Sequence, residues 1–442
     1  MSDVVVVGGG VAGITAASRL AEAGRRPTLL EARKSLGGRA SAFPDPSTGH
    51  RVDNGQHLLM GCNRSVRSLL ERIGAADAVT WQPRLDLALA STTHGAVRLR
   101  LPPLPGPLAA VAGLLFTSGL GWSDRLGAAR AVRAFLRGGP ELDGRTVAEV
   151  QDHLGTPPAA RAHVLEPLAL ATLNDRPDRA LATALAAVVR EAFGAGAAAA
   201  GLGLPRRDLE EIFGRPAHRF IEARGGRVAT QRPVAAVVAG AQGVEGVTLE
   251  SGETIEARAV VVAVPPWALA SLLPQEARPE GLEKLPSSPI VSATVWLDRP
   301  VMDELVIGLV GTTAQWAFNR SRLLSLEGPG QVVAITVSAA DDLLAPPKAD
   351  IVETLLEDLR RLVPAARRAR LYHAVVVKER RATVPLRPGE TSSRPGLRTS
   401  IPGLYLAGGW TATGLPDTLE GAARSGEQAA EALLADGPAG TP

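Results

Sequence analysis

Cysteine and aromatic residues are scarce in this chain of 442 residues. The single cysteine, Cys62, excludes an intrachain disulfide, a zinc site built from cysteines and an iron–sulfur cluster held by cysteines, and we expect no metal site. A chain without disulfides is typical of a reducing compartment, so we expect a cytoplasmic protein. Aromatic residues make up 3% of the sequence, which disfavours nucleic-acid binding by base stacking.

Lysine is also rare, and the excess of positive charge is small. Lysine occurs at four positions, so arginine supplies nearly all of the 48 basic side chains. They are opposed by 45 acidic side chains, which leaves a net charge of +3. This balance favours no polyanionic partner, and we expect no binding to nucleic acid.

A secretory signal is absent as well. Such a signal carries basic residues before its apolar segment, whereas Met1–Asp3 leads directly into the apolar run Val4–Val7. We therefore expect no export. The hydrophobic share of 45% and the charged share of 21% are typical of a globular chain, and the length predicts two or three domains.

The N-terminal residues predict a strand, a glycine-rich turn and a helix. The run Val4–Val7 has the character of a buried strand, and Gly8, Gly10 and Gly13 follow it in the spacing G-x-G-x-x-G. Such glycines let the backbone approach a pyrophosphate, whose charge the next helix N-terminus stabilises. Glu31 ends the following strand, where an acid binds the ribose hydroxyls of a dinucleotide. The pattern therefore predicts a dinucleotide site.

A second glycine pair follows in the segment from Ala32 to Arg39. Glu31, Arg33, Gly38 and Arg39 belong to the pattern E-x-R…G-G-R. The glycines would allow another close backbone approach, and the arginine could aim its guanidinium at phosphate. The pattern resembles the flavin-binding fingerprint of the FAD-dependent amine oxidase and carotenoid desaturase superfamily. This resemblance favours FAD over NAD as the cofactor.

The remaining sequence predicts an α/β protein with three parts. Strands expected within 228–264 end in a buried apolar run, which resembles the second piece of a split Rossmann-like FAD-binding domain. The expected ranges are 1–62, 215–270 and 395–442 for this FAD-binding domain, 63–214 for a helical insert that faces substrate or membrane, and 271–394 for a mixed α+β substrate domain with an antiparallel sheet.

A segment without any charged residue spans 101–123. Its apolar part is shorter than the ~20 residues of a spanning helix and contains glycines, which disfavours a transmembrane helix. Two alternatives remain: a surface helix that dips into a membrane, and a buried helix that lines an apolar tunnel. Arginines follow at helical spacing and suit either anionic lipid headgroups or a solvated helix face, at Arg125, Arg130, Arg133 and Arg137.

The C-terminal motif predicts a short strand, a glycine pair and a helix start. Gly408 and Gly409 follow the strand, and the helix is expected to begin at Thr418, Leu419 and Glu420. Its N-terminus would place N–H groups at the pyrimidine edge of the flavin. The superfamily usually carries an acid in place of Gly409, where it helps to bind the cofactor. We expect weaker FAD binding here, or a water that substitutes for the acid.

Motifs in the middle of the chain narrow the resemblance. With them, the sequence from residue 4 to about 432 is similar to the hydroxysqualene dehydroxylase family of bacterial hopanoid synthesis. The resemblance implies FAD-dependent reductive dehydroxylation of hydroxysqualene, a C30 isoprenoid lipid, to squalene. It also implies peripheral association with the inner face of the cytoplasmic membrane and contact with upstream prenyl synthases. The motifs are Asp53–His57, Glu166–Asn174, Leu204–Leu209, Arg381–Thr383 and Trp410–Pro416.

This reaction needs an apolar tunnel, one proton donor and exclusion of bulk water. An allylic hydroxyl leaves as water once it is protonated, and a hydride from reduced flavin replaces it. Three residues are candidate donors: His57 in the segment expected to face the flavin, Glu166 in an apolar context that raises a carboxyl pKa, and Asp417 beside the helix start. Each has a structural alternative, respectively a polar contact with flavin, a helix-end or salt-bridge role, and helix capping.

The cofactor contacts expected from all of these motifs are Gly8, Gly10, Val11, Ala12, Gly13, Glu31, Ala32, Arg33, Gly38, Arg39, Gly55, Gln56, His57, Val234, Gly408, Gly409, Thr418, Leu419 and Glu420.

Three other functions stay open. The same fold run oxidatively would be a carotenoid or polyene desaturase, and an apolar tunnel fits both directions. Amine oxidases often carry a tyrosine two residues before an E-G-A motif, where this chain has Thr418. A flavin-binding scaffold without turnover is supported only by Gly409.

Overall fold

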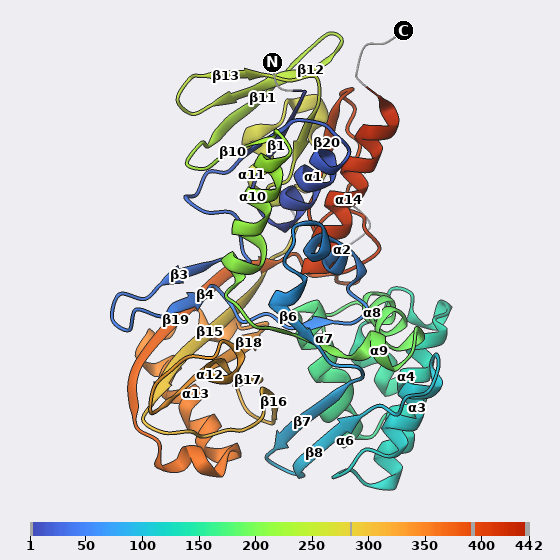
Figure 1. Cartoon of the computed structure of the whole chain (residues 1–442). Helices are drawn as coiled ribbons and strands as arrows, with labels where there is room; N and C mark the ends of the chain where they lie inside the picture. The colour runs from blue at the N-terminus through green and yellow to red at the C-terminus, as the bar shows by residue number, and fades with distance from the viewer. Residues whose placement is uncertain (1–2, 283–284, 390–393, 438–442) are drawn as a thin grey trace.

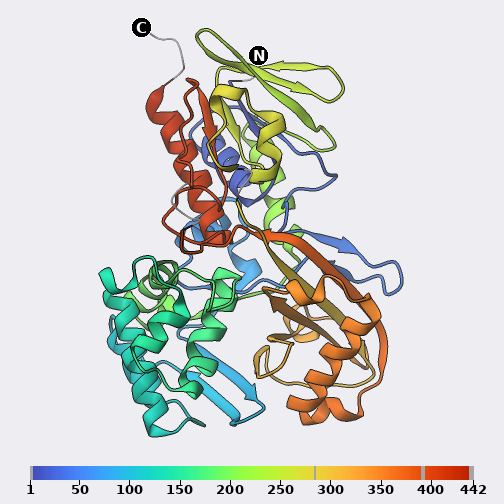
Figure 2. The same cartoon turned by 180° about the vertical axis from the view of Figure 1, so that it is seen from behind.

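The computed structural model describes residues 3–282, 285–389 and 394–437. An upper lobe carries both ends of the described chain, and two further lobes lie side by side below it (Figure 1). The view from behind shows the same arrangement (Figure 2). The outermost parts of the range predicted for the FAD-binding domain, 1–2 and 438–442, lie outside the described residues.

The upper lobe is built on a five-stranded parallel sheet, which confirms the predicted α/β fold. Alternate residues of the first strand enter two different cores. Val4 and Val6 pack with the flanking helices, and Val5 and Val7 pack with an antiparallel meander. Burial on both faces explains the unbroken valine run. In sheet order, the strands are β10 (Arg227–Ala229), β2 (Pro27–Leu30), β1 (Val4–Val7), β14 (Val260–Val262) and β20 (Leu404–Leu406).

Helices and the meander cover the two faces of this sheet. On the first face, the first and last helices of the chain pack against each other. Those on this face are α1 (Val11–Glu22), α2 (Arg64–Arg72), α10 (Arg215–Ala223) and α14 (Leu419–Asp436). On the other face lie β11 (Val234–Gly240), β12 (Gly243–Leu249), β13 (Thr254–Glu256) and α11 (Pro266–Leu272).

The lower lobe on the left of Figure 1 contains most of a seven-stranded sheet, which one long helix, α13 (Lys348–Leu362), covers. The last two strands of this sheet lie toward the other lower lobe. In sheet order, the strands are β19 (Leu371–Thr383), β15 (Ser288–Leu297), β18 (Gln331–Ser338), β17 (Trp316–Asn319), β16 (Val306–Val310), β7 (Asp86–Ser91) and β8 (Gly95–Arg100). The short helix α12 (Arg320–Leu323) follows β17 directly.

The other lower lobe is mostly helical. Its core is made of alanine, leucine and valine side chains, as the composition predicts. Its helices are α3 (Leu108–Leu115), α4 (Trp122–Arg137), α5 (Val147–His153), α6 (Pro158–Ala160), α7 (Glu166–Leu173), α8 (Ala182–Gly194) and α9 (Ala197–Ala200), with a π-helical turn at Arg161–Leu165. None of the described helices combines the length and the apolar character that crossing a membrane requires.

Small sheets lie where the lobes meet. A hairpin is formed by β3 (Ala42–Pro44) and β4 (Arg51–Asp53). A three-stranded sheet contains β5 (Leu59–Met60), β9 (Leu202–Pro205) and β6 (Val79–Trp81). The 194–203 segment, whose glycine and alanine content suggests a flexible connector, instead contains α9, in which Ala197 and Ala200 are buried, and the start of the fully buried β9.

The range predicted for the helical insert, 63–214, includes elements that lie in the other lobes. Helix α2 packs with α1 and α14 in the upper lobe because its apolar face belongs to that core. Strands β7 and β8 extend the lower sheet, where β7 pairs with β16 in parallel. The sheet expected to be antiparallel therefore has one parallel pair. The sequence could not predict this pair, because β7 and β16 lie more than 200 residues apart and strand pairing depends on such distant neighbours.

Two of the three motif glycines in the turn after β1, Gly8 and Gly13, have no room for a side chain, and the third, Gly10, has. Gly8 has a φ of +102°, a conformation that favours glycine. A Cβ at Gly13 would overlap the carbonyl oxygen of Gly8. A Cβ at Gly10 would meet no protein atom within 4 Å, and its φ of −71° is open to any residue. One glycine is thus required by the fold and another is not.

We predict that Gly13→Ala destabilises the FAD-free protein by roughly 3 kcal/mol, because backbone atoms cannot move aside as a side chain can. Gly10→Ala is the matched control and should cost no more than about 1 kcal/mol at this helix N-cap. Urea unfolding of both variants checks this. Equal losses would contradict the packing described for Gly13.

Candidate flavin and substrate site

The glycine turn and Glu31 form a cradle at the carboxyl ends of β1 and β2. The Glu31 carboxylate is buried and accepts hydrogen bonds from the N–H groups of Gly9 at 2.7 Å and Arg33 at 2.8 Å. The open space beside Gly10 admits a ligand where a side chain would block it. The predicted contacts Val11 and Ala12 lie in the first turn of α1, whose N–H groups suit an anion.

The second glycine pair packs directly on the first. The N–H of Gly37 donates to the carbonyl of Gly9 at 2.8 Å. Gly38 has a φ of +60°, and a Cβ there would lie 3.0 Å from the Cα of Gly10. A dinucleotide cradle made of backbone alone results from these two turns, and it fits a pyrophosphate.

The meander begins next to the same cradle. The N–H of Arg232 donates to the carbonyl of Glu31 at 2.9 Å, and the N–H of Gln231 donates to that of Arg33 at 3.0 Å. Val234 opens β11 two residues later and is half-buried. The structure therefore brings Val234 beside Glu31, Ala32 and Arg33, although 200 residues separate them in sequence.

A buried carboxylate joins both ends of the chain to the lower sheet. Asp417 Oδ2 accepts from Arg39 Nη1 at 3.1 Å and from the N–H of Val384 at 3.0 Å. Arg39 also donates to the carbonyl of Ala382. The guanidinium expected to point at phosphate is thus held by protein groups. Asp417 is an acceptor in a three-way link, and the helix cap is its neighbour Thr418.

Gly409 lies against this link. A Cβ at Gly409 would overlap Asp417 Oδ1, so the Asp417 carboxylate fills the space that a side chain at 409 would need. The superfamily acid is absent from position 409, but a carboxylate from Asp417 stands beside it. Arg394 fixes the loop between them, donating to the carbonyls of Gly409 at 3.0 Å and Leu415 at 2.8 Å.

Helix α14 begins as predicted. Thr418 is its N-cap, and the Thr418 hydroxyl accepts from the N–H of Gly421 at 3.1 Å. The Gly408 N–H donates to Ser425 Oγ in the same helix at 2.8 Å. The N–H groups of this first turn, including those of Leu419 and Glu420, remain the part of the helix suited to a flavin edge.

The Glu420 side chain binds the start of helix α2. Its two oxygens accept from the N–H groups of Ser65 and Val66, each at 3.0 Å, and so cap the start of α2. The carboxylate is 4% exposed. Only the backbone of Glu420 is therefore available for the cofactor contact predicted there.

His57 is poised as an acceptor rather than a donor. Its Nδ1 lies 2.7 Å from the carbonyl of Gly55, which assigns the proton to Nδ1 and leaves Nε2 with a lone pair. Burial lowers the pKa of His57, so the ring is neutral near pH 7. A neutral imidazole in this tautomer cannot protonate a hydroxyl through Nε2.

A buried charge network beside His57 was not foreseen. Arg320 is 2% exposed and donates to the Asp53 carboxylate, to Gln56 Oε1 at 2.6 Å and to the carbonyl of Arg51 at 3.0 Å. It fixes the segment that carries Gly55 and His57. Gln56 is a predicted cofactor contact, but its side-chain amide oxygen accepts a hydrogen bond from this arginine. No local pattern distinguishes Arg320, because its partners lie more than 260 residues earlier.

Glu166 differs from the other two candidate donors. It is half-buried at the start of α7 and has no hydrogen-bonding or ionic partner among the described residues. Burial raises the pKa of its carboxyl, and Arg161 offsets part of that effect. The far end of α7 is tied to the lower sheet by Asn174, whose Nδ2 donates to Thr383 Oγ1 at 2.9 Å.

The chain is similar along nearly its whole length to known flavin-dependent proteins. Residues 11–434 match the model of the flavin containing amine oxidoreductase family. The hydroxysqualene dehydroxylase of Sinorhizobium fredii is 31% identical, over 98% of this chain and 99% of its own. The 15-cis-phytoene desaturase of an Oncidium hybrid cultivar is 28% identical, over 98% of this chain and 78% of its own.

A solved structure supports the fold. An oxidoreductase from Methanosarcina mazei superposes with a TM-score of 0.74 at 16% identity, over 97% of this chain and 100% of that one. The glycine cradle, Glu31 and the family match agree on FAD as the cofactor. The chain belongs to the flavin-containing amine oxidoreductase family, in the branch that contains the hydroxysqualene dehydroxylases.

Proposed function

We propose that this enzyme replaces the allylic hydroxyl of hydroxysqualene by hydrogen, giving squalene and water. The observation that carries the proposal is the full-length similarity to hydroxysqualene dehydroxylase, combined with an unpartnered, half-buried acid in the helical lobe. FAD, when bound in its reduced form, supplies the hydride. The proton, the orientation of the substrate and the exclusion of water must come from groups of this protein.

Glu166 is the proposed proton donor. A carboxyl with a raised pKa retains its proton to higher pH, and no side chain in the described ranges forms a hydrogen bond or ion pair with Glu166. His57 is neutral with its proton committed to Gly55, and Asp417 is committed to Arg39 and Val384. Protonation lets the hydroxyl leave as water, and the allylic cation that remains accepts the hydride. One proton and one hydride thus replace the hydroxyl with hydrogen.

His57 and Arg320 then take supporting roles. Arg320 holds the Asp53–His57 segment through three acceptors, so the imidazole keeps one orientation. Its free Nε2 can accept a hydrogen bond from the flavin or from the departing water. The core of the helical lobe is apolar, and an apolar lobe beside the site would exclude bulk water from a short-lived cation.

Membrane docking through α3 and α4 would deliver such a substrate. Exposed large apolar side chains gather on these two helices and the turn between them, with Phe116 80% exposed and Trp122 62% exposed. Such a patch is typical of a membrane or protein contact. We propose that it rests on the inner face of the cytoplasmic membrane, where upstream prenyl synthases release lipid products. The residues are Leu104, Leu108, Phe116, Trp122 and Leu126.

Anaerobic incubation with two substrates separates this function from its alternative. Protein with reduced FAD should convert hydroxysqualene to squalene, and protein with oxidised FAD should leave phytoene unchanged. The similarity to phytoene desaturase makes the second arm necessary. Desaturated phytoene without squalene would assign the enzyme to the oxidative reaction instead.

Glu166→Gln should lower kcat about 100-fold or more, within the range typical of general acid catalysis, and leave KM little changed. In the wild type, kcat should fall as pH rises through the raised pKa of Glu166, because the acid must be protonated. Steady-state kinetics across pH tests both points. The exposed Glu141→Gln is the control and should match wild type. An unchanged pH profile in Glu166→Gln would reject this donor.

Gly10→Ala should weaken FAD binding by about tenfold or more, because its methyl group occupies the space left for the pyrophosphate. Titration of the FAD-free protein with FAD, followed by flavin fluorescence, measures this. The protein should keep its thermal stability without FAD. Retention of wild-type affinity would show that the cofactor does not approach Gly10.

Phe116→Ser combined with Trp122→Ser should lower the affinity for vesicles of phosphatidylglycerol and phosphatidylcholine by at least about tenfold, since two large apolar side chains leave the bilayer. Sedimentation with vesicles measures it. Tyr372→Ser is the matched control, because Tyr372 is 74% exposed on β19 in another lobe. Equal losses for both proteins would place the docking surface elsewhere.

A further inference from the structure

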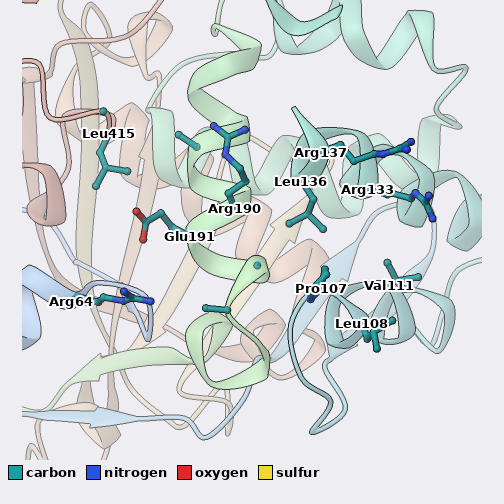
Figure 3. Close-up of a pocket in the computed structure, with 14 residues that line it drawn as sticks. Arg64, Pro107, Leu108, Val111, Arg133, Leu136, Arg137, Arg190, Glu191 and Leu415 are labelled. Atoms are coloured by element: carbon teal, nitrogen blue, oxygen red, sulfur yellow. The ribbon is translucent and has the colours of Figure 1, made fainter. Parts of the chain in front are cut away.

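A cavity of about 980 Å³ lies between the helical lobe and the loop that precedes α14 (Figure 3). This volume is at the upper end of the ~300–1,000 Å³ typical of ligand pockets. Helices α3, α4 and α8 form one side, and Arg64 with Leu415 closes the other. The cavity is separate from the glycine cradle, since no cradle residue lines it.

Four arginines line this cavity. In the described part of the chain, none of their guanidinium groups forms an ion pair or a hydrogen bond. The sole acid in the lining, Glu191, is paired with Arg424 at 3.1 Å. The four are Arg64, Arg133, Arg137 and Arg190. Free guanidinium groups around one cavity are suited to phosphate, which they bind through two parallel hydrogen bonds.

The other half of the lining is apolar. Leu108 and Val111 project from α3 and Leu136 from α4 on the side where Arg133 and Arg137 also lie. Leu108 is 62% exposed and belongs to the apolar patch that continues to Phe116. The cavity therefore opens at the surface proposed to meet the membrane.

A cavity lined by arginines on one part and apolar side chains on another suits an amphiphile with a negative headgroup. A neutral polyene alcohol offers nothing to four guanidinium groups, so the proposed substrate does not explain them. A free phosphate would leave the apolar side without a partner. A phosphodiester joined to acyl chains satisfies both sides, and the continuity of the cavity with the exposed patch favours a lipid from the membrane itself.

We propose that this cavity binds the headgroup of an anionic glycerophospholipid. The phosphate binds Arg133 and Arg137, which lie on the same side of the cavity in Figure 3, and the first part of an acyl chain lies on Leu108 and Val111. Arg133 and Arg137 are one helical turn apart and reach the same ligand. The inference extends the proposed membrane docking and does not depend on hydroxysqualene being the substrate.

Short-chain lipids test the cavity apart from any membrane. FAD-loaded protein is titrated calorimetrically with dihexanoyl phosphatidylglycerol and with dihexanoyl phosphatidylcholine, both below their micelle concentrations. We expect saturable one-to-one binding of the anionic lipid alone. Arg133→Gln combined with Arg137→Gln should weaken it about tenfold or more, as expected for charged hydrogen bonds. Arg130→Gln is the control, because Arg130 is exposed on the same helix but does not line the cavity.

The possible outcomes separate the lipid site from its alternatives. Equal binding of both lipids, equal losses in the Arg130→Gln control, or pyrophosphate binding as tightly as the anionic lipid would each overturn the proposal. Vesicle binding that fails while the short-chain anionic lipid still binds would reject the docking surface and leave the cavity site standing. Absence of short-chain binding would reject the site whatever the vesicles show.

Discussion

The contact between Asp417 and Arg39 is the constraint on which the arrangement of the lobes depends. It joins residues 378 apart in the chain, and the same carboxylate oxygen holds the N–H of Val384 at the end of the lower sheet. The segment after the glycine cradle, the start of α14 and the end of the lower sheet therefore meet at one buried carboxylate. Because Gly409 has no side chain, this carboxylate occupies the space that a side chain at position 409 would need.

A division of labour among the acidic residues follows from this junction. Asp417 and Glu420 are committed to backbone and guanidinium donors, Glu31 to the cradle, and Asp53 to Arg320. Each of these carboxylates shapes the site without being free to deliver a proton. Glu166 alone of the candidate donors combines partial burial with the lack of a partner. In the proposed reaction, the helical lobe supplies the acid and the upper lobe binds the cofactor.

The sequence predicts best what is local. The first strand, the glycine turn and the helix after it lie within 31 residues of one another, and the start of α14 depends only on its own residues, so the sequence predicts both. The placement of β7 beside β16, the buried Arg320 and the Asp417–Arg39 pair depend on residues hundreds of positions apart. A single sequence contains no pattern for such pairs, since an arginine bound to a distant carboxylate resembles any surface arginine.

The most direct test of the reductive chemistry is a single turnover without oxygen. Enzyme carrying reduced FAD is mixed with one equivalent of hydroxysqualene, and the return of the oxidised flavin absorbance is followed together with product. One flavin oxidised for each squalene formed, at the same rate, is the predicted result. Flavin that stays reduced, or squalene that forms without flavin oxidation, would contradict a hydride transfer from this cofactor.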